Sequence, residues 1–428
     1  MRERDAREVA RRGVDALVRS AGSSVAVQAQ LLLGSLYGRR IAVLVGPGMN
    51  GADGRVAAHI LRARGCRVDL IEVASQPREI HGVELIIDAA FGLGCRRPYV
   101  APSIGPSVKV LAVDLPSGVD ADTGALLGQP LKADVTLALG ALKYAHVDGE
   151  AANFVGELRC NTLGMASPLD DFLITDDDLA DYVRGASTDH KWSHALTVLA
   201  GSPRMPGAAA LVCAGALAAG ASMVLLESKG RIADLVHLPA EVVRSRENEI
   251  DARSRCVVVG PGLGPKSGAW LKDRLTKLSL PSVLDADALR PDVVSLARSA
   301  PRVLTPHAKE FERLGGVLEG ARRIPSVRRL AAESDCVILL KGPITLISDP
   351  QGYLRVVNSG TNALATAGTG DVLAGMIGAS IARGHDPLEA AALSAHLHAI
   401  AGTRLAAYQS ATALPSAVTA CLKYRQRR

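Results

Sequence analysis

The residues from Ala367 to Asp371 combine a carboxylate with a turn of small residues, directly ahead of an apolar run of helical periodicity. The first turn of a helix leaves backbone N–H groups unpaired at the positive end of the helix dipole, and such a turn can bind a phosphate. Asp371 is therefore a candidate general base beside a candidate anion site. Asp is also a favoured N-cap residue and glycines often mark simple turns, so a structural role would explain the same letters.

Three further polar turns follow predicted strands in the first half of the chain. A glycine-rich turn, residues 46–54, follows the β-branched run 41–45, and Asp88 and Asp114 each end another short apolar run. The carboxyl ends of the strands in an open α/β sheet meet at one edge, where ligands bind. Capping could explain any single acid, but three such turns together favour a ligand site.

The elements that position these residues alternate between strand and helix along both halves of the chain. Strands are predicted at 41–45, 68–73, 85–87, 108–113, 135–139, 195–199, 256–259, 282–284, 303–304 and 337–340, and in a hairpin from 345 to 357. A helix is predicted at 55–64, after the glycine-rich turn. The pattern weakens between 161 and 189. This order is typical of α/β proteins and predicts two domains, residues 1–175 and 176–428.

Composition excludes several classes of function. The 428 residues are 48% apolar but only 3% aromatic, which argues against a base-stacking surface for nucleic acid. The net charge is +6, with Lys and Arg scattered among acids, and the one dense basic run, Lys423–Arg428, reads as a solvated tail. We therefore expect small-molecule partners and no nucleic-acid partner.

One segment could be mistaken for a membrane span. Residues 205–226 carry no charge and are long enough to cross a bilayer. Gly220, however, divides an Ala-rich stretch from the short strand 223–226, which predicts a buried helix followed by a buried strand. The N-terminus lacks the apolar core of a secretory signal, and the seven cysteines include no CxxC pair. These features predict free thiols, no membrane association and a cytoplasmic location.

The ordered motifs of the chain resemble the bifunctional NAD(P)H-hydrate repair enzymes, in which a hydrate epimerase is fused to an ADP- or ATP-dependent (S)-NAD(P)H-hydrate dehydratase. The motifs are GPGMNGADG at 46, DAAFGLG at 88, DLPSGVDADTG at 114, LGALKYAH at 139, HKWSHALTVLAGS at 190, MPGAA at 205, GPGLG at 260, DADAL at 285, LTPHAKEF at 304, KGPIT at 341 and TAGTGD at 366. Each motif alone is weak, but the ordered set is specific and covers nearly the whole chain. The resemblance implies an N-terminal Rossmann-like three-layer domain, a C-terminal ribokinase-like α/β domain and a homo-oligomer.

For the second half, the resemblance implies phosphorylation of the 6-hydroxyl of the S-hydrate of NADH or NADPH by ADP or ATP, followed by loss of phosphate. Asp371 would be the catalytic base, since a base must take the proton of a poorly nucleophilic hydroxyl. The nucleotide would contact Lys341, Gly342, Pro343, Ile344, Thr345, Gly368, Thr369 and Gly370, and the hydrate would contact Ala208, Gly262, His307 and Asp371. Mg²⁺ is expected with the phosphates. Without its motif, His307 would read as a histidine buried after a strand.

For the first half, the resemblance implies interconversion of R- and S-hydrates beside a K⁺ ion. Asn50, Asp88 and Ser117 would bind K⁺, since hard oxygens suit a hard cation. Asn50, Gly51, Asp53 and Asp114 would contact the substrate, with Asp114 as the acid–base group.

The chain departs from the family pattern at several positions. Met49 replaces an Asn and Ala52 a Gly, an acid expected near Arg19 is absent, and residues 95–97, Cys-Arg-Arg, make the second loop more basic. In the second half, Trp192, Ser193 and Ala195 interrupt a pattern of small residues.

One rival interpretation is a ribokinase-like small-molecule kinase whose N-terminal half is a catalytically silent binding module. The two interpretations differ in their products. A kinase leaves a stable phosphoester, whereas a dehydratase releases inorganic phosphate and regenerates reduced nicotinamide.

Overall fold

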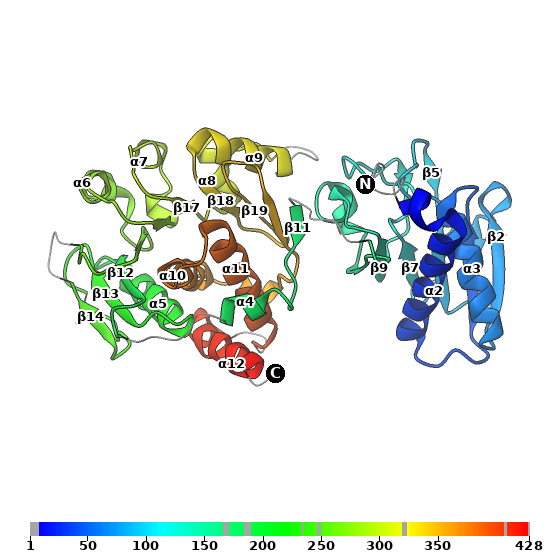
Figure 1. Ribbon diagram of the computed structural model, residues 1–428, viewed down its shortest axis with the longest axis horizontal. Coiled ribbons are helices and arrows are strands. Elements are labelled where there is room, and N and C mark those ends of the chain that lie inside the picture. Colours follow the sequence, from blue (N-terminus) through cyan, green and yellow to red (C-terminus); the bar gives the residue numbers. More distant parts are fainter. Residues whose placement is uncertain are drawn as a thin grey trace. The chain divides into compact units, whose positions relative to one another are not determined.

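The computed structural model describes residues 8–165, 171–183, 190–232, 235–245, 250–318, 323–405 and 409–426 (Figure 1). The chain divides into two compact units, one made of Met1–Leu169 with Glu319–Arg323 and the other of Asp170–Leu318 and Ile324–Arg428. Each unit contains its own sheet and its own hydrophobic core.

The first unit is built on a six-stranded sheet in the order β10-β9-β7-β4-β1-β2, in which every pair is parallel. The strands are β1 Arg40–Val45, β2 Arg67–Glu72, β4 Leu85–Ala89, β7 Lys109–Val113, β9 Val135–Leu139 and β10 Glu157–Asn161. The central strands are buried on both faces, as expected for apolar runs in a parallel sheet. All five strands predicted in this half are present, and β10 was not predicted.

Two helices of the first unit, α2 Val14–Leu33 and α3 Met49–Ala63, lie side by side (Figure 1). Short elements complete the unit: β3 Glu79–Ile80, β5 Tyr99–Val100, β6 Ser103–Ile104 and β8 Gly128–Gln129, with 3-10 turns η1 Val73–Ser75, η2 Tyr144–His146 and η3 Glu150–Asn153.

The prediction that residues 46–54 form a turn was wrong in its second part, because α3 begins at Met49 rather than at Arg55. Gly51 and Gly54 are therefore buried helical residues. A Cβ at Gly51 would lie 2.0 Å from the carbonyl oxygen of Gly46, and a Cβ at Gly54 would lie 2.6 Å from the Cβ of Ala89. The glycines allow the helix to approach the ends of β1 and β4.

The second unit is built on a ten-stranded sheet in the order β11-β20-β19-β18-β17-β16-β15-β12-β13-β14. Its strands are β11 Asp171–Leu173, β12 Ala195–Leu199, β13 Met223–Glu227, β14 Val242–Arg244, β15 Cys256–Val259, β16 Ser282–Leu284, β17 Arg302–Leu304, β18 Val337–Leu340, β19 Thr345–Ser348 and β20 Leu354–Val357. Only β19 runs antiparallel to its neighbours, as the predicted hairpin requires. The predicted strands of this half are all present.

Helices surround this sheet (Figure 1). They are α4 Leu179–Val183, α5 Pro206–Ala218, α6 Gly268–Thr276, α7 Pro291–Val294, α8 Ala308–Arg313, α9 Arg323–Ser334, α10 Thr369–Ala382, α11 Pro387–Thr403 and α12 Leu414–Gln426, with 3-10 turns η4 Pro265–Ser267, η5 Ala286–Ala288, η6 Asn362–Leu364 and η7 Ala411–Ala413. The helix α10 is almost entirely buried. It packs closely on α5, where a Cβ at Gly215 would lie 2.3 Å from the carbonyl oxygen of Val372.

The uncharged segment 205–226 folds as α5 followed by β13, as predicted. No helix within the described residues is long and apolar enough to cross a membrane. All seven cysteines are free, and six are buried. The boundary between residues 175 and 176 stays a prediction of where the two functional domains divide. The strand β11, which precedes this boundary, pairs with β20 of the second sheet.

Candidate active sites

In the second unit, Asp371 is the third residue of α10. Gly368 caps the helix with a φ of 93°, a left-handed conformation that glycine adopts without strain. Asp371 therefore stands in the first turn, beside backbone N–H groups that have no partner within the helix. Burial, and next the negative charge of Asp285, raise its pKa to about 7, although Lys341 acts in the opposite direction. A carboxyl group with this pKa can exchange a proton near neutral pH.

Lys341 and Asp285 form an ion pair next to Asp371. The Lys341 Nζ donates to Asp285 Oδ1 at 2.8 Å, and the Thr305 hydroxyl donates to the same oxygen at 2.8 Å. A Cβ at Gly370 would lie 3.4 Å from the Lys341 Nζ, so the amine reaches the first turn of α10. Burial opposes the charge of Lys341, but Asp285 raises its pKa overall. The first turn of α10 therefore has a permanent cation beside it.

The remaining residues predicted to bind the nucleotide lie on two segments. Gly342, Pro343 and Ile344 form the turn between β18 and β19, closed by a 3.3 Å hydrogen bond from the Thr345 hydroxyl to the Gly342 carbonyl. The Thr369 hydroxyl donates to the carbonyl of Leu364, which closes the turn ahead of α10.

The residues predicted to contact the hydrate fall into two groups. Ala208 and Gly262 touch, since a Cβ at Gly262 would lie 2.7 Å from that of Ala208. The side chain of His307 is 54% exposed, so His307 is not a buried histidine, as it would have been expected to be without its motif. It also has a local role: its Nδ1 accepts from the Glu310 N–H at 3.3 Å and caps α8.

Two groups near this site were missed by the sequence analysis. Asp287 lies close enough to Asp371 to raise its pKa, and its Oδ2 accepts from the Gly264 N–H at 2.7 Å. His398 donates from Nε2 to the Thr369 carbonyl at 2.9 Å, and burial lowers its pKa to about 4. The DADAL motif contains Asp287, but nothing in the sequence connects His398 with α10.

In the first unit, a cavity of about 1010 Å³ lies at the carboxyl ends of the strands. Of the residues predicted to contact the substrate, Asn50, Asp53 and Asp114 line it, whereas Gly51 does not. The remaining lining residues that matter for its chemistry are Met49, Gly92, Cys95, Arg96, Arg97 and Lys143. Burial, and next the charge of Asp114, raise the pKa of Asp53 to about 8.

Asp114 is held by an ion pair that the sequence analysis missed. The buried Lys143 Nζ contacts Asp114 Oδ1 and also donates to the Leu139 carbonyl at 2.8 Å. His146 contacts the Asp114 carbonyl oxygen from Nε2 at 2.5 Å and accepts from the Lys143 N–H at Nδ1. Asp114 has a φ of 65°, so these contacts hold a backbone conformation that is unusual for a residue other than glycine. The only signal in the sequence was the LGALKYAH motif itself.

Of the three residues predicted to bind K⁺, Asp88 and Ser117 meet at the end of β4, and Asn50 contacts the end of β7. Asp88 is completely buried, and it accepts from the Ser117 N–H at 2.8 Å and from the Ser117 hydroxyl at 2.5 Å. Asn50 donates from Nδ2 to the Val113 carbonyl at 3.1 Å, which leaves its amide oxygen for another partner. Burial raises the pKa of Asp88. A buried carboxyl group beside a hydroxyl oxygen supplies the type of ligand that fits a hard monovalent cation.

Two family models match the chain. One, described as NAD(P)H-hydrate dehydratase, matches residues 196–423, and the other, described as the YjeF-related protein N-terminus, matches residues 14–82 and 73–145. The bifunctional NAD(P)H-hydrate repair enzyme Nnr of Mycobacterium leprae is 36% identical over 87% of this chain and 85% of its own length. The enzyme of the same name from Escherichia coli K12 is 31% identical over 86% of this chain and 81% of its own length.

The second unit also matches solved structures. The ADP/ATP-dependent NAD(P)H-hydrate dehydratase of Bacillus subtilis, co-crystallised with ATP and Mg²⁺, is 29% identical with a TM-score of 0.51, covering 56% of this chain and 92% of that one. A ribokinase-like superfamily protein of Enterococcus faecalis, 21% identical with a TM-score of 0.55, shares the fold. The relatives favour hydrate repair over the rival small-molecule kinase.

Proposed function

Since the chain belongs to the family of bifunctional NAD(P)H-hydrate repair enzymes, we propose that the cavity of the first unit and the cluster around Asp371 in the second unit divide the repair of NADH and NADPH hydrates between them. The second unit dehydrates the S-hydrate at the expense of ADP or ATP, and the first unit interconverts the R- and S-hydrates. The observation that carries the proposal is Asp371, a carboxyl group with a pKa of about 7 in the first turn of α10, beside the Lys341 amine.

The first step of the dehydration is phosphoryl transfer to the 6-hydroxyl of the hydrate. Asp371 takes the hydroxyl proton, the oxygen forms a bond to the terminal phosphorus of the nucleotide, and the P–O bond to the leaving AMP or ADP breaks. The N–H groups of Gly368, Thr369 and Gly370 stabilise the charge on the phosphoryl oxygens. The Lys341 ammonium adds a positive charge at the same turn.

The second step is elimination. The C6–O bond breaks with its electron pair leaving on phosphate, and the C5 proton passes to water, so that the C5–H electron pair restores the ring double bond. The turn Gly342–Thr345 is the proposed contact for the nucleotide, and Ala208, Gly262 and His307 are those proposed for the hydrate. Mg²⁺, when bound with the nucleotide, neutralises part of the phosphate charge.

Epimerisation is assigned to the cavity of the first unit. Asp114 is the acid–base group, and Lys143 is the positioning residue that holds its carboxylate toward the cavity. Asn50, Gly51 and Asp53 are the proposed contacts for the hydrate.

The buried oxygens of Asp88 and Ser117, with the amide oxygen of Asn50, are the proposed K⁺ ligands. The ion, when bound, supplies a positive charge beside the anionic substrate. Replacement of K⁺ by choline is expected to slow epimerisation by the wild-type protein and to leave dehydration unchanged, and Asp88→Asn is expected to abolish the K⁺ effect. If epimerisation were equally fast in choline, the K⁺ assignment would be wrong.

The decisive experiment for the second unit is dehydration of racemic NADH hydrate with ADP and with ATP, comparing the wild type with Asp371→Asn. We expect the variant to lose turnover while it still binds nucleotide, and the wild type to release inorganic phosphate with recovery of reduced-nicotinamide absorbance. A stable phosphoester product would instead identify a kinase.

Two properties of the whole protein are also proposed. A cytoplasmic location agrees with seven free cysteines, since such thiols persist in a reducing compartment. A homo-oligomer is expected from the family, and light scattering would test it.

A further inference from the structure

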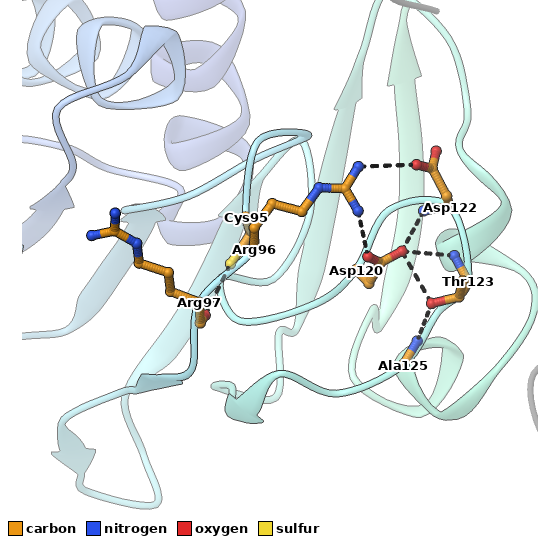
Figure 2. A network of polar contacts seen from close by, with 7 residues as sticks. All are labelled: Cys95, Arg96, Arg97, Asp120, Asp122, Thr123 and Ala125. Atoms are coloured by element: carbon orange, nitrogen blue, oxygen red, sulfur yellow. Dashed lines mark hydrogen bonds and ion pairs between the residues drawn. The ribbon is translucent and has the colours of Figure 1, made fainter.

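The loop after β4 brings two arginines to the cavity of the first unit. Arg96 and Arg97 both line this cavity, and their side chains extend to opposite sides of the loop (Figure 2). Neither residue has a role in the proton transfer assigned to Asp114.

Arg96 fastens the loop. Its Nη1 donates to Asp120 Oδ2 at 2.9 Å and its Nη2 to Asp122 Oδ2 at 3.4 Å (Figure 2). Asp120 is itself fixed, since its Oδ1 accepts from the N–H of Thr123 at 2.9 Å and the Thr123 hydroxyl at 3.0 Å. Partial burial opposes the charge of Asp120, but these hydrogen bonds lower its pKa overall. The Arg96 guanidinium is therefore already paired with carboxylates of the same unit.

Cys95 fixes the neighbouring part of the loop. Its side chain is buried, its N–H donates to the Gly92 carbonyl at 3.0 Å, and its thiol contacts the Arg97 carbonyl at 3.7 Å. The carbonyl of Arg97 is thus held by the Cys95 thiol while its side chain stays exposed.

Arg97 differs from the other cations that line the cavity. Lys143 is paired with Asp114 and Arg96 with Asp120, whereas Arg97 has no carboxylate partner among the residues that the structure describes. A Cβ at Gly92, in the same loop, would lie 3.5 Å from Asp114 Oδ2. The loop that carries Arg97 therefore passes directly beside the proposed acid–base group. An unpaired guanidinium in a cavity suits a phosphate, which it can bind through two parallel hydrogen bonds.

We propose that Arg97 binds a phosphate group of the dinucleotide hydrate in the cavity of the first unit, and that Arg96, held by Asp120, positions it. This inference rests on the epimerase function proposed above. The phosphate is either one of the bridging pyrophosphate, present in both NADH and NADPH hydrates, or the 2′-phosphate, present only in NADPH hydrate. Arg97 therefore determines affinity, and in the second case also the choice between the two hydrates.

The experiment measures epimerisation of the R-hydrates of NADH, of NADPH and of reduced nicotinamide riboside, which has no phosphate, by wild type, Arg97→Gln and Arg97→Lys. We expect Arg97→Gln to raise KM about tenfold for a phosphorylated substrate, with kcat little changed, as the loss of one charged contact predicts. Lys should recover part of the affinity. An equal rise for both dinucleotides would identify the pyrophosphate, and a rise confined to NADPH hydrate would identify the 2′-phosphate.

The riboside hydrate and a second variant separate loss of a phosphate contact from general damage to the protein. The KM of the riboside hydrate should be the same for wild type and Arg97→Gln, since this substrate carries no phosphate. Arg67→Gln removes an exposed arginine at the opposite edge of the same sheet and should change nothing. An unchanged KM for both dinucleotides, or an equal rise for the riboside, would overturn the proposal. Failure of the wild type to epimerise any hydrate would instead refute the proposed function.

Discussion

The Nζ of Lys341 lies 2.8 Å from Oδ1 of Asp285, and the pair stands beside the first turn of the helix that carries Asp371. Asp285 follows β16 and Lys341 follows β18, so the strand order brings them to one edge of the sheet. The pair has opposite effects on Asp371: Asp285 raises its pKa and Lys341 lowers it. Burial raises the pKa of the proposed base most, and these two neighbours adjust it in opposite directions.

This balance predicts the pH dependence of dehydration. Asp371 must be ionised to accept a proton, so kcat/KM should rise with pH through a midpoint of about 7. Asp285→Asn removes a negative charge that raises the pKa of Asp371, so the midpoint should move to lower pH, read from initial rates between pH 5 and pH 9. Asp335→Asn, which changes an exposed acid, is the matched control and should leave the midpoint in place. A midpoint that Asp285→Asn leaves unmoved would contradict this electrostatic account.

Variants of Lys341 and Asp285 should affect the stability of the fold and the affinity for nucleotide differently. Lys341→Met leaves the buried Asp285 carboxylate without its cation and should lower the free energy of unfolding by about 3 kcal/mol. Adding Asp285→Asn to this variant removes the unpaired charge and should restore most of the stability, measured by urea denaturation. Nucleotide affinity, measured by calorimetry, should stay low in both variants. Recovery of nucleotide affinity in the double variant would show that Lys341 does not contact the phosphates.

The backbone of Asp114 predicts different outcomes for two substitutions. Both Asp114→Asn and Asp114→Ala should abolish epimerisation. Ala at a φ of 65° should also cost about 1–2 kcal/mol of stability relative to Asn, because a left-handed conformation crowds its Cβ and Asn tolerates it. Thermal unfolding of the two variants would give this difference. Equal melting temperatures would mean that the strain is relieved by local rearrangement.

The helix α3 predicts an unusual effect of alanine. Gly→Ala inside a helix normally stabilises it by about 1 kcal/mol. Gly51→Ala should instead destabilise the first unit and slow epimerisation, because the new Cβ would lie 2.0 Å from the Gly46 carbonyl oxygen. Gly94→Ala, outside the helix and with nothing within 4 Å of the added Cβ, is the control and should be neutral in thermal unfolding. A Gly51→Ala variant as stable as the control would contradict the close approach of α3 to β1.

Much of the fold was predictable from the sequence because parallel strands are short, continuous apolar runs between turns. β9 and β12 were located to the residue for this reason. β10 was not predicted because its sequence, Glu-Leu-Arg-Cys-Asn, contains no apolar run, and β14 was not predicted because it is only three residues long. The start of α3 was misplaced because glycines that permit close packing look the same in sequence as glycines that form a turn.

The site residues were predictable only where a motif contained them. The contact of Lys143 with Asp114 joins positions 29 residues apart, and no local pattern reports it. The role of Arg96 was equally hidden, since its partner Asp120 lies on a different loop. Periodicity indicates which side chains are buried, but the pairing of charges depends on which strand ends become neighbours in the sheet.

The interlocked glycines of α5 and α10 have a mechanical consequence for the reaction. Gly215 fits against the carbonyl of Val372, and Gly375 fits against that of Val212, with room for no Cβ at either place. Sliding or rotation of α10 would drive backbone into backbone within one residue of Asp371. The proposed base is therefore a stationary part of the second unit, and any closure around the nucleotide and hydrate has to come from segments that approach it.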